Sequence, residues 1–157
     1  LYTPQYQYQY FTAIALSGKR VKMNTTYFLN CVAGNLFMSK TSPALPAEMF
    51  IGLSKSPPQI DGTGVTEPSA SAGYTRVKLT SLSEPQDGVV TNQSSITFPE
   101  STADWGTVTY FVVYDSSKVG SGNLLIYGKL AKPRTIEEAT TVTISEDFLV
   151  LSIQNPA

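Results

Sequence analysis

Histidine is absent from the 157-residue sequence, and the chain has one cysteine, Cys31. The sequence therefore lacks the commonest general base and the commonest metal-ligating side chain. A single cysteine excludes a disulfide bond within the chain and leaves the redox compartment undecided. We therefore expect no cofactor and no metal site, and few side chains are available for catalysis.

Charged residues are also scarce, at 15% of the sequence against about 25% in a typical soluble domain. The net charge of −1 provides no broad positive field with which to bind nucleic acid or an anionic membrane. The sequence contains no apolar run of about 18 residues, the length that a membrane-spanning helix needs. We expect no nucleic-acid partner and no membrane insertion, but neutral contacts with other protein subunits.

The longest run of strand-forming residues, WGTVTYFVVYD at 105–115, predicts a central β-strand. Both of its faces are largely apolar, so the strand is expected to be packed on both sides, or on one side against a partner chain. Strict alternation places on one face Val108, Tyr110, Val112 and Tyr114, and on the other Trp105, Thr107, Thr109, Phe111 and Val113.

A short helix is predicted for residues 24–38, with Asn24 as its N-cap. Its apolar stripe at helical spacing consists of Phe28, Leu29, Val32 and Leu36. Cys31 lies beside this stripe and is interpreted as a small buried residue, because no histidine is present to activate it as a nucleophile.

Alternation and proline positions predict four further strands. Residues 74–79 read as a strand with one solvent-facing side that carries Arg76. Residues 123–130 read as a strand that Pro133 terminates. Segments 140–145 and 147–153 are expected to form a hairpin.

Residues 23–157 are expected to form a single domain, large enough to bury its own core. About seven or eight short strands separated by Gly and Pro turns come after the helix, which predicts a mainly β fold. The expected architecture is an antiparallel β-sandwich, jelly-roll-like, preceded by the N-terminal helix.

Residues 1–22 differ in character from the remainder of the chain, and two interpretations stay open. The sequence begins with Leu1, and the segment GKRVK before Met23 has the composition of a translated ribosome-binding sequence. Residues 1–22 would then be a non-native extension. Alternatively, they form a real N-terminal arm that adds a strand to a neighbouring subunit.

Five blocks of the chain carry a family resemblance: NTTYFLNCVAGNLF, MFIGLSKSPP, DGTGVTEPSASAGYTRV, SSITFPESTADWGTVTYFVVYDSS and GNLLIYGKLAKPRTI. In order and spacing, the stretch from Met23 to Ala157 resembles the small tail-fibre or minor tail proteins of tailed bacteriophages and prophages. The resemblance implies a virion structural protein, assembled in the bacterial cytoplasm, that acts by assembly and host-surface adhesion. Residues 1–22 fall outside it.

Phage appendages are usually symmetric oligomers, so we expect contacts with other virion proteins and a homo-oligomer. A trimer is the working assumption, although the sequence does not specify the number of subunits. Two alternatives stay open: a capsid-surface decoration or head fibre protein that stabilises the shell by binding to it, and a free carbohydrate-binding module.

Candidate site residues are few. Hydrolysis of a glycoside requires two facing carboxylates, and candidates by residue type alone sit at predicted strand ends or turns, so no catalytic site is expected. A host-surface glycan would be bound by exposed aromatic rings, yet aromatic rings also serve as core or interface packing, which we favour. The carboxylate candidates are Glu100, Asp104, Asp115 and Glu146, and the aromatic candidates are Tyr74, Trp105, Tyr110, Tyr114 and Tyr127.

Overall fold

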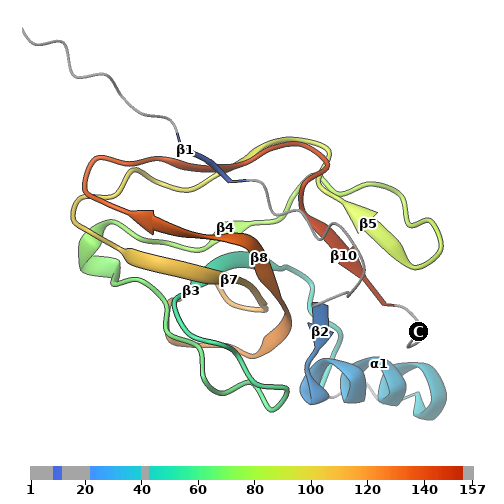
Figure 1. Cartoon of the computed structure of the whole chain (residues 1–157). Helices are drawn as coiled ribbons and strands as arrows, with labels where there is room; N and C mark the ends of the chain where they lie inside the picture. The colour runs from blue at the N-terminus through green and yellow to red at the C-terminus, as the bar shows by residue number, and fades with distance from the viewer. Residues whose placement is uncertain (1–8, 12–21, 40–42, 154–157) are drawn as a thin grey trace, which may run out of the picture.

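The computed structural model of the protein describes residues 9–11, 22–39 and 43–153. Within these ranges the chain is mainly β, with antiparallel sheets and one α-helix near the N-terminus, as the sequence predicts (Figure 1). The elements in chain order are β1 (Gln9–Phe11), β2 (Lys22–Asn24), α1 (Thr26–Met38), β3 (Phe50–Ser54), the short 3₁₀-helix η1 (Ala70–Ala72), β4 (Val77–Lys78), β5 (Val89–Thr91), β6 (Ile96–Thr97), β7 (Gly106–Tyr114), β8 (Leu124–Ile136), β9 (Val142–Ile144) and β10 (Val150–Ser152).

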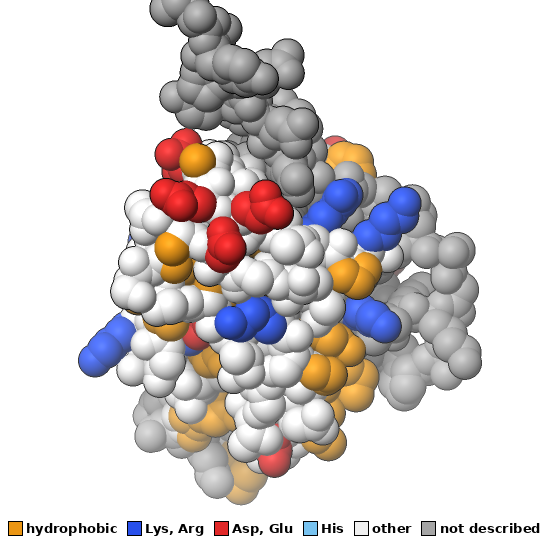
Figure 2. Space-filling model, turned by 60° about the vertical axis from the view of Figure 1, so that its left-hand side comes forward, with side chains coloured by type: hydrophobic (Ala, Val, Ile, Leu, Met, Phe, Trp, Pro, Cys, Tyr) orange, Lys and Arg blue, Asp and Glu red, His pale blue; other side chains and the backbone are white. Residues whose placement is uncertain are grey.

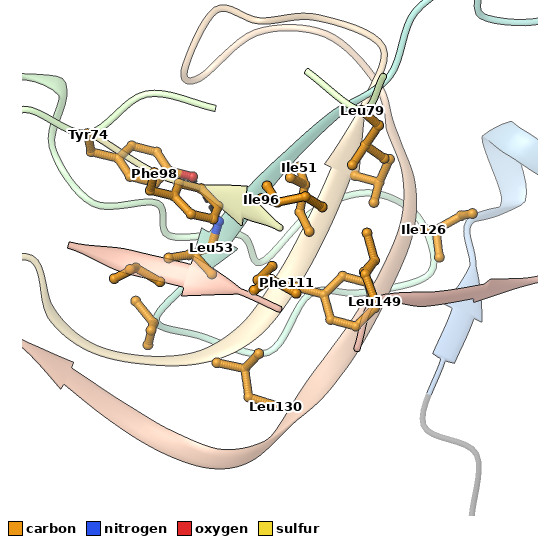
Figure 3. Packing of buried hydrophobic residues seen from close by; sticks show 14 of the residues in the cluster. Ile51, Leu53, Tyr74, Leu79, Ile96, Phe98, Phe111, Ile126, Leu130 and Leu149 are labelled. Carbon is orange, nitrogen blue, oxygen red and sulfur yellow. Dashed lines mark hydrogen bonds between the residues drawn. The ribbon is translucent and has the colours of Figure 1, made fainter. Parts of the chain in front are cut away.

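Three sheets are formed by the described strands. The largest has the strand order β2-β8-β7-β3-β4, and all of its neighbouring strands are antiparallel. The second has the order β1-β9-β6, and the third consists of β10 and β5. Ile96 of β6 and Ile144 of β9 share one hydrophobic core with Ile51 of β3 and Phe111 of β7, so the first two sheets pack face to face (Figure 3).

Three aromatic rings pack against one another within this core. Trp105 and Tyr74 meet edge to face with ring centroids 5.2 Å apart, and Phe98 stacks on Tyr74 at 6.3 Å. The indole Nε1 of Trp105 donates a hydrogen bond of 2.7 Å to the carbonyl of Ala72. The one polar atom of the indole is thereby satisfied, which is what lets so large a side chain be fully buried.

β7 lies in the middle of the five-stranded sheet, and its C-terminal half is buried on both faces, as predicted. The ladder between β7 and β8 shifts register between Val108 and Tyr110. Val108 therefore packs in the main core with Phe111, whereas Tyr110 and Val112 lie on the opposite face. The prediction that Val108 shares a face with Tyr110 is wrong, because an irregularity in the ladder interrupts the two-residue alternation.

β8 runs through Pro133 to Ile136, whereas the sequence predicts a strand over residues 123–130 that Pro133 prevents from continuing. The ladder passes directly from the Tyr110–Lys129 pair to the Val108–Arg134 pair. Pro133 lies between Lys129 and Arg134, in a stretch of β8 that pairs with no other described strand. Its missing N–H group therefore costs no hydrogen bond of the β7–β8 ladder, which is the condition under which proline is tolerated in a strand.

The predicted hairpin of residues 140–145 and 147–153 is also wrong. β9 pairs with β6 and β1, whereas β10 pairs with β5, so the two strands enter different sheets. The expected turn at Glu146–Asp147 is present, and the Phe148 N–H donates to the Ser145 carbonyl at 3.2 Å. The Asn92 side chain, however, donates to the Ser145 carbonyl and accepts from the Leu149 N–H on either side of this turn, and the two strands diverge beyond it.

The N-cap of α1 is Thr25 rather than the predicted Asn24, which is the last residue of β2. The Thr25 hydroxyl accepts a hydrogen bond from the Phe28 N–H and donates one to the Leu124 carbonyl in β8. Phe28 and Cys31 form the buried face of the helix. The threonine therefore starts the helix and attaches it to the five-stranded sheet at the same time.

Most of the predicted N-terminal arm, residues 1–8 and 12–21, lies outside the described residues. Gln9–Phe11 form β1, which runs parallel to β9 of the same chain.

Candidate functional site

Helix α1 exposes an uncharged apolar surface. Exposed fractions reach 69% for Leu36, 81% for Phe37 and 65% for Met38, and Leu29 is 48% exposed. We call these four residues the α1 apolar surface. Leu29 and Leu36 belong to the predicted apolar stripe, but they are exposed. Phe28 and Cys31 are the buried residues of the helix, because the hydrogen bond from Thr25 to β8 sets the orientation of the helix on the sheet.

An exposed cluster of this kind differs from the isolated apolar residues that are normal on protein surfaces. No charged residue occurs between Met23 and Ser39, so the helix has no charged face to keep it in water. Contiguous exposed apolar surface marks sites of contact with other proteins or ligands. The α1 apolar surface is thus a candidate interface.

The surface charge elsewhere agrees with this view. On the face that Figure 2 shows, Asp and Glu side chains gather towards one end, Lys and Arg side chains are dispersed, and most of the surface is neutral.

No helix in the described part of the chain is long and apolar enough to cross a membrane. Among the described residues, no group of three or more Cys, Asp or Glu side chains is arranged to hold a metal ion.

A second candidate site is a cleft of about 430 Å³ between two loops at the end of β7. One wall comes from the loop after β3 and the other from the loop between β7 and β8, with Tyr114 between them. We call it the loop cleft, and its lining residues are Gly62, Thr63, Gly64, Val65, Glu67, Tyr114, Val119, Gly120 and Gly122.

Arg76 connects the two walls of the loop cleft through hydrogen bonds. Its Nε and Nη2 donate to the two carboxylate oxygens of Glu67 at 2.8 and 2.7 Å. Its Nη1 donates to the carbonyls of Ser116 and Ser121 in the opposite loop at 2.7 and 2.8 Å. The Arg76 side chain is fully buried and that of Glu67 is 6% exposed, so this is a desolvated bidentate ion pair.

This arrangement corrects the prediction that Arg76 faces solvent. The predicted strand over residues 74–79 shrinks to β4, and both Tyr74 and Arg76 are buried. A charged residue in an alternating pattern reads as exposed, and only the position of Glu67 in space reveals its partner. The sequence does not reveal Glu67 as the partner of Arg76 for the same reason, since Glu67 lies in a loop of turn-forming residues.

Tyr114 and Tyr74 lie against this ion pair. The Tyr74 hydroxyl donates to Glu67 at 2.9 Å and accepts from the Leu53 N–H at 2.8 Å. Burial, and next the negative charge of Glu67, raise the pKa of Tyr74 well above its ordinary value. The same two causes raise the pKa of Tyr114, and the positive charge of Arg76 opposes them.

The five predicted aromatic residues divide between two faces. Tyr74 and Trp105 are core residues with 0% and 1% exposure, so they do not form a surface for a sugar. Tyr114 and Tyr127 form a small buried cluster on the other face of the sheet, and Tyr110 packs against it. Burial, with Tyr110 next, raises the pKa of Tyr127. Of the five, Tyr114 lines the loop cleft.

Two of the candidate carboxylates stabilise turns. Asp115 accepts hydrogen bonds from the Asn123 backbone and side chain at 2.7 and 2.8 Å. Asp104 accepts from the Glu138 N–H at 2.9 Å. These contacts give both side chains a structural role at the ends of β7.

Comparison with known families now decides the class of protein. The family described as Podophage GP4 fiber I protein gp80 matches residues 24–152. The chain belongs to this family. It is therefore a bacteriophage fibre protein, a structural component associated with the virion, as the resemblance in the sequence implied at the level of a phage fibre. Among curated proteins, none matches the chain.

Proposed function

We propose that this fibre protein is a non-catalytic component of the phage tail that assembles with copies of itself and with other virion proteins, and that it contributes to adhesion at the host surface. The observation that carries the proposal is the α1 apolar surface. A fibre is built from repeated protein contacts, and each contact needs a surface that remains exposed in the single folded chain.

The energetics favour assembly through this surface. Phe37 and Leu36 are the most exposed of the large hydrophobic side chains that the structure describes. Covering one such side chain is worth about 1.5–3 kcal/mol, and a handful of central apolar side chains dominates a typical interface. With no charge between Met23 and Ser39, two copies of α1 would meet without electrostatic repulsion.

The oligomeric state tests this part of the proposal. Native mass spectrometry of the full chain is expected to show an oligomer, and its mass gives the number of subunits. Phe37→Glu is expected to shift the population towards monomer without lowering the melting temperature of the monomer, because Phe37 is 81% exposed. A wild-type chain that stays monomeric at high concentration contradicts self-assembly.

Ala70→Glu is the matched control. Ala70 is exposed in η1, which lies on the opposite side of the molecule from α1 (Figure 1). The substitution introduces the same charge and is expected to leave the oligomer intact. Equal dissociation by both variants would mean that added charge, and not the α1 apolar surface, disrupts the assembly.

The position in the virion is tested separately. Immunogold labelling of purified virions with an antibody against residues 23–157 is expected to place gold on the tail. Gold spread over the head would instead make the protein a head fibre or capsid-decoration protein. Unlabelled particles would contradict both positions.

A further inference from the structure

We propose that α1 packs, through its outward side, against α1 of a second copy of this chain. The inference rests on the self-assembly part of the proposed function and deepens it by naming the partner of the α1 apolar surface. It is carried by the residues on the two sides of the helix, by their spacing and by the absence of charge.

Helix α1 is apolar on both of its sides. Phe28 and Cys31 are buried against the rest of the chain. With about 3.6 residues per turn, the side that faces away from them carries Leu29, Ala33 and Leu36, and all three are exposed. A surface helix normally has a polar outward side, whereas a helix that is apolar all round is buried on all sides. The outward side of α1 is thus expected to be covered by another chain.

The outward residues have the spacing of a helix-pairing seam. Leu29, Ala33 and Leu36 follow one another at intervals of four and three residues, with which the core positions of coiled coils recur. Ala33 stands between the two leucines, and its small side chain lets two helix axes approach closely. Phe37 extends the seam at its C-terminal end. An identical helix can therefore pack its leucines beside the alanine of its partner.

The lack of charge favours the same helix as the partner. No charged residue occurs between Met23 and Ser39. Charges beside a helix seam select some partners and reject others, and α1 has none that would repel its own copy. In a symmetric oligomer, an element beside the symmetry axis meets the same element of the next copy. Pairing of α1 with α1 satisfies both conditions.

Apolar surface continues beside α1. Leu45 and Ile60 are 50% and 51% exposed. The Asn35 side chain donates to the Pro43 carbonyl, two residues before Leu45, and the Thr26 N–H donates to the Ile60 carbonyl. Hydrogen bonds thus connect both flanking segments to the helix. A 13-residue helix is about 20 Å long, and the flanking residues enlarge the contact towards the roughly 800 Å² per partner of a stable interface.

Disulfide cross-linking of the full chain tests the proposal. Ala33→Cys places a thiol at the centre of the seam, where paired helices bring two Cα atoms within the separation of about 4.4–6.8 Å that a disulfide needs. Mild oxidation is expected to convert this variant into covalent dimers. The native Cys31 is buried, so the oxidised wild type is expected to give none.

Ala70→Cys is the matched control for the cross-link. Ala70 is exposed in η1, on the opposite side of the molecule from α1 (Figure 1). The substitution is chemically the same as Ala33→Cys, and the oxidised variant is expected to run as a single chain in denaturing electrophoresis. Cross-linking of both variants to the same extent would mean that random collision, and not pairing of α1, brings the thiols together.

Neutral substitutions in the seam provide a second test. Leu29→Gln and Leu36→Gln add no charge and keep a similar helix propensity. Each removes an apolar side chain from both copies, so the dissociation constant of the oligomer is expected to rise about tenfold or more. Sedimentation at a series of concentrations measures this change. The melting temperature of the monomer is expected to stay the same, because both leucines are exposed.

An oligomer in which Ala33→Cys forms no cross-link, or wild-type affinity in both glutamine variants, would overturn the inference. The outcome is separable from that of the proposed function. An oligomer that Phe37→Glu dissociates but that gives no Ala33→Cys cross-link overturns the pairing of α1 with α1 alone. A wild-type chain that stays monomeric at high concentration overturns self-assembly as well.

Discussion

The guanidinium group of Arg76 lies against the ring of Tyr114, with its central carbon 3.6 Å from the ring centre. This cation–π contact is buried, where such contacts are strongest. The two residues are far apart in the sequence, one beside β4 and the other at the end of β7. Because Tyr114 ends β7 and lines the loop cleft, this contact connects the Arg76–Glu67 ion pair to the sheet and to the cleft.

Removal of Arg76 is expected to be strongly destabilising. Arg76→Met leaves the Glu67 carboxylate buried without its counter-ion, which costs about 3–5 kcal/mol in the free energy of unfolding. Urea unfolding measures this loss. The double variant with Glu67→Leu removes both charges and is expected to be more stable than Arg76→Met alone. A double variant less stable than the single one would contradict a buried, mutually dependent pair.

Stability is expected to fall in alkaline solution. The folded-state pKa values of Tyr74, Tyr114 and Tyr127 are raised above the ordinary value of 10.0. The unfolded chain therefore releases these protons first, so the stabilisation is complete below about pH 10 and is lost as the pH rises towards the folded-state values.

Urea unfolding at a series of pH values from about 8 to 12 measures this dependence. Tyr74→Phe removes one of the tyrosines with a raised pKa, which also include Tyr27, and is expected to give a shallower decline than the wild type, from a lower starting stability. A free energy of unfolding that stays constant across the series would contradict the raised pKa values.

The Asn92→Asp substitution is expected to destabilise the folded protein. Its buried amide nitrogen donates to the carbonyls of Ser94 and Ser145, and its oxygen accepts from the Leu149 N–H. Asn92→Asp loses both donors and faces a carboxylate towards two carbonyls, so we expect a loss of about 2–5 kcal/mol near neutral pH.

The pH dependence separates this explanation from a general packing defect. The repulsion raises the pKa of the new carboxyl group, so the Asn92→Asp variant is expected to recover stability as the pH is lowered through that value. Gln93→Glu, an adjacent exposed position with the same change of charge, is the control and should unfold like the wild type. Equal losses in both variants would contradict the role of Asn92.

The sequence predicted the elements better than their pairing. The strand character of β7 was readable from its own residues, because β-branched and aromatic side chains favour extended backbone on a half-buried surface. The register shift at Val108 cannot be predicted from the residues of β7, since it depends on the partner strand β8. The effect of Pro133 on β8 cannot be predicted either, because a missing N–H group matters only where the neighbouring strand would have accepted its hydrogen bond.

The candidate site shows the same division. Tyr114 was readable as one of five aromatic candidates, but Tyr74 and Trp105 belong to the core. The ion pair between Glu67 and Arg76 cannot be predicted from the sequence, because neither the composition of the loop nor the alternation of residues 74–79 indicates it. Their contact exists because the fold brings the loop after β3 beneath the end of β7.

Local residue preferences, composition and the order of sequence blocks are enough to predict the mainly β class, the helix near residues 24–38, the low charge and the relation to phage fibre proteins. The faces of α1, the separation of β9 from β10 and the burial of Arg76 became visible in the folded chain alone. Each of these depends on hydrogen bonds between residues distant in the chain, and such bonds leave no local pattern in the sequence.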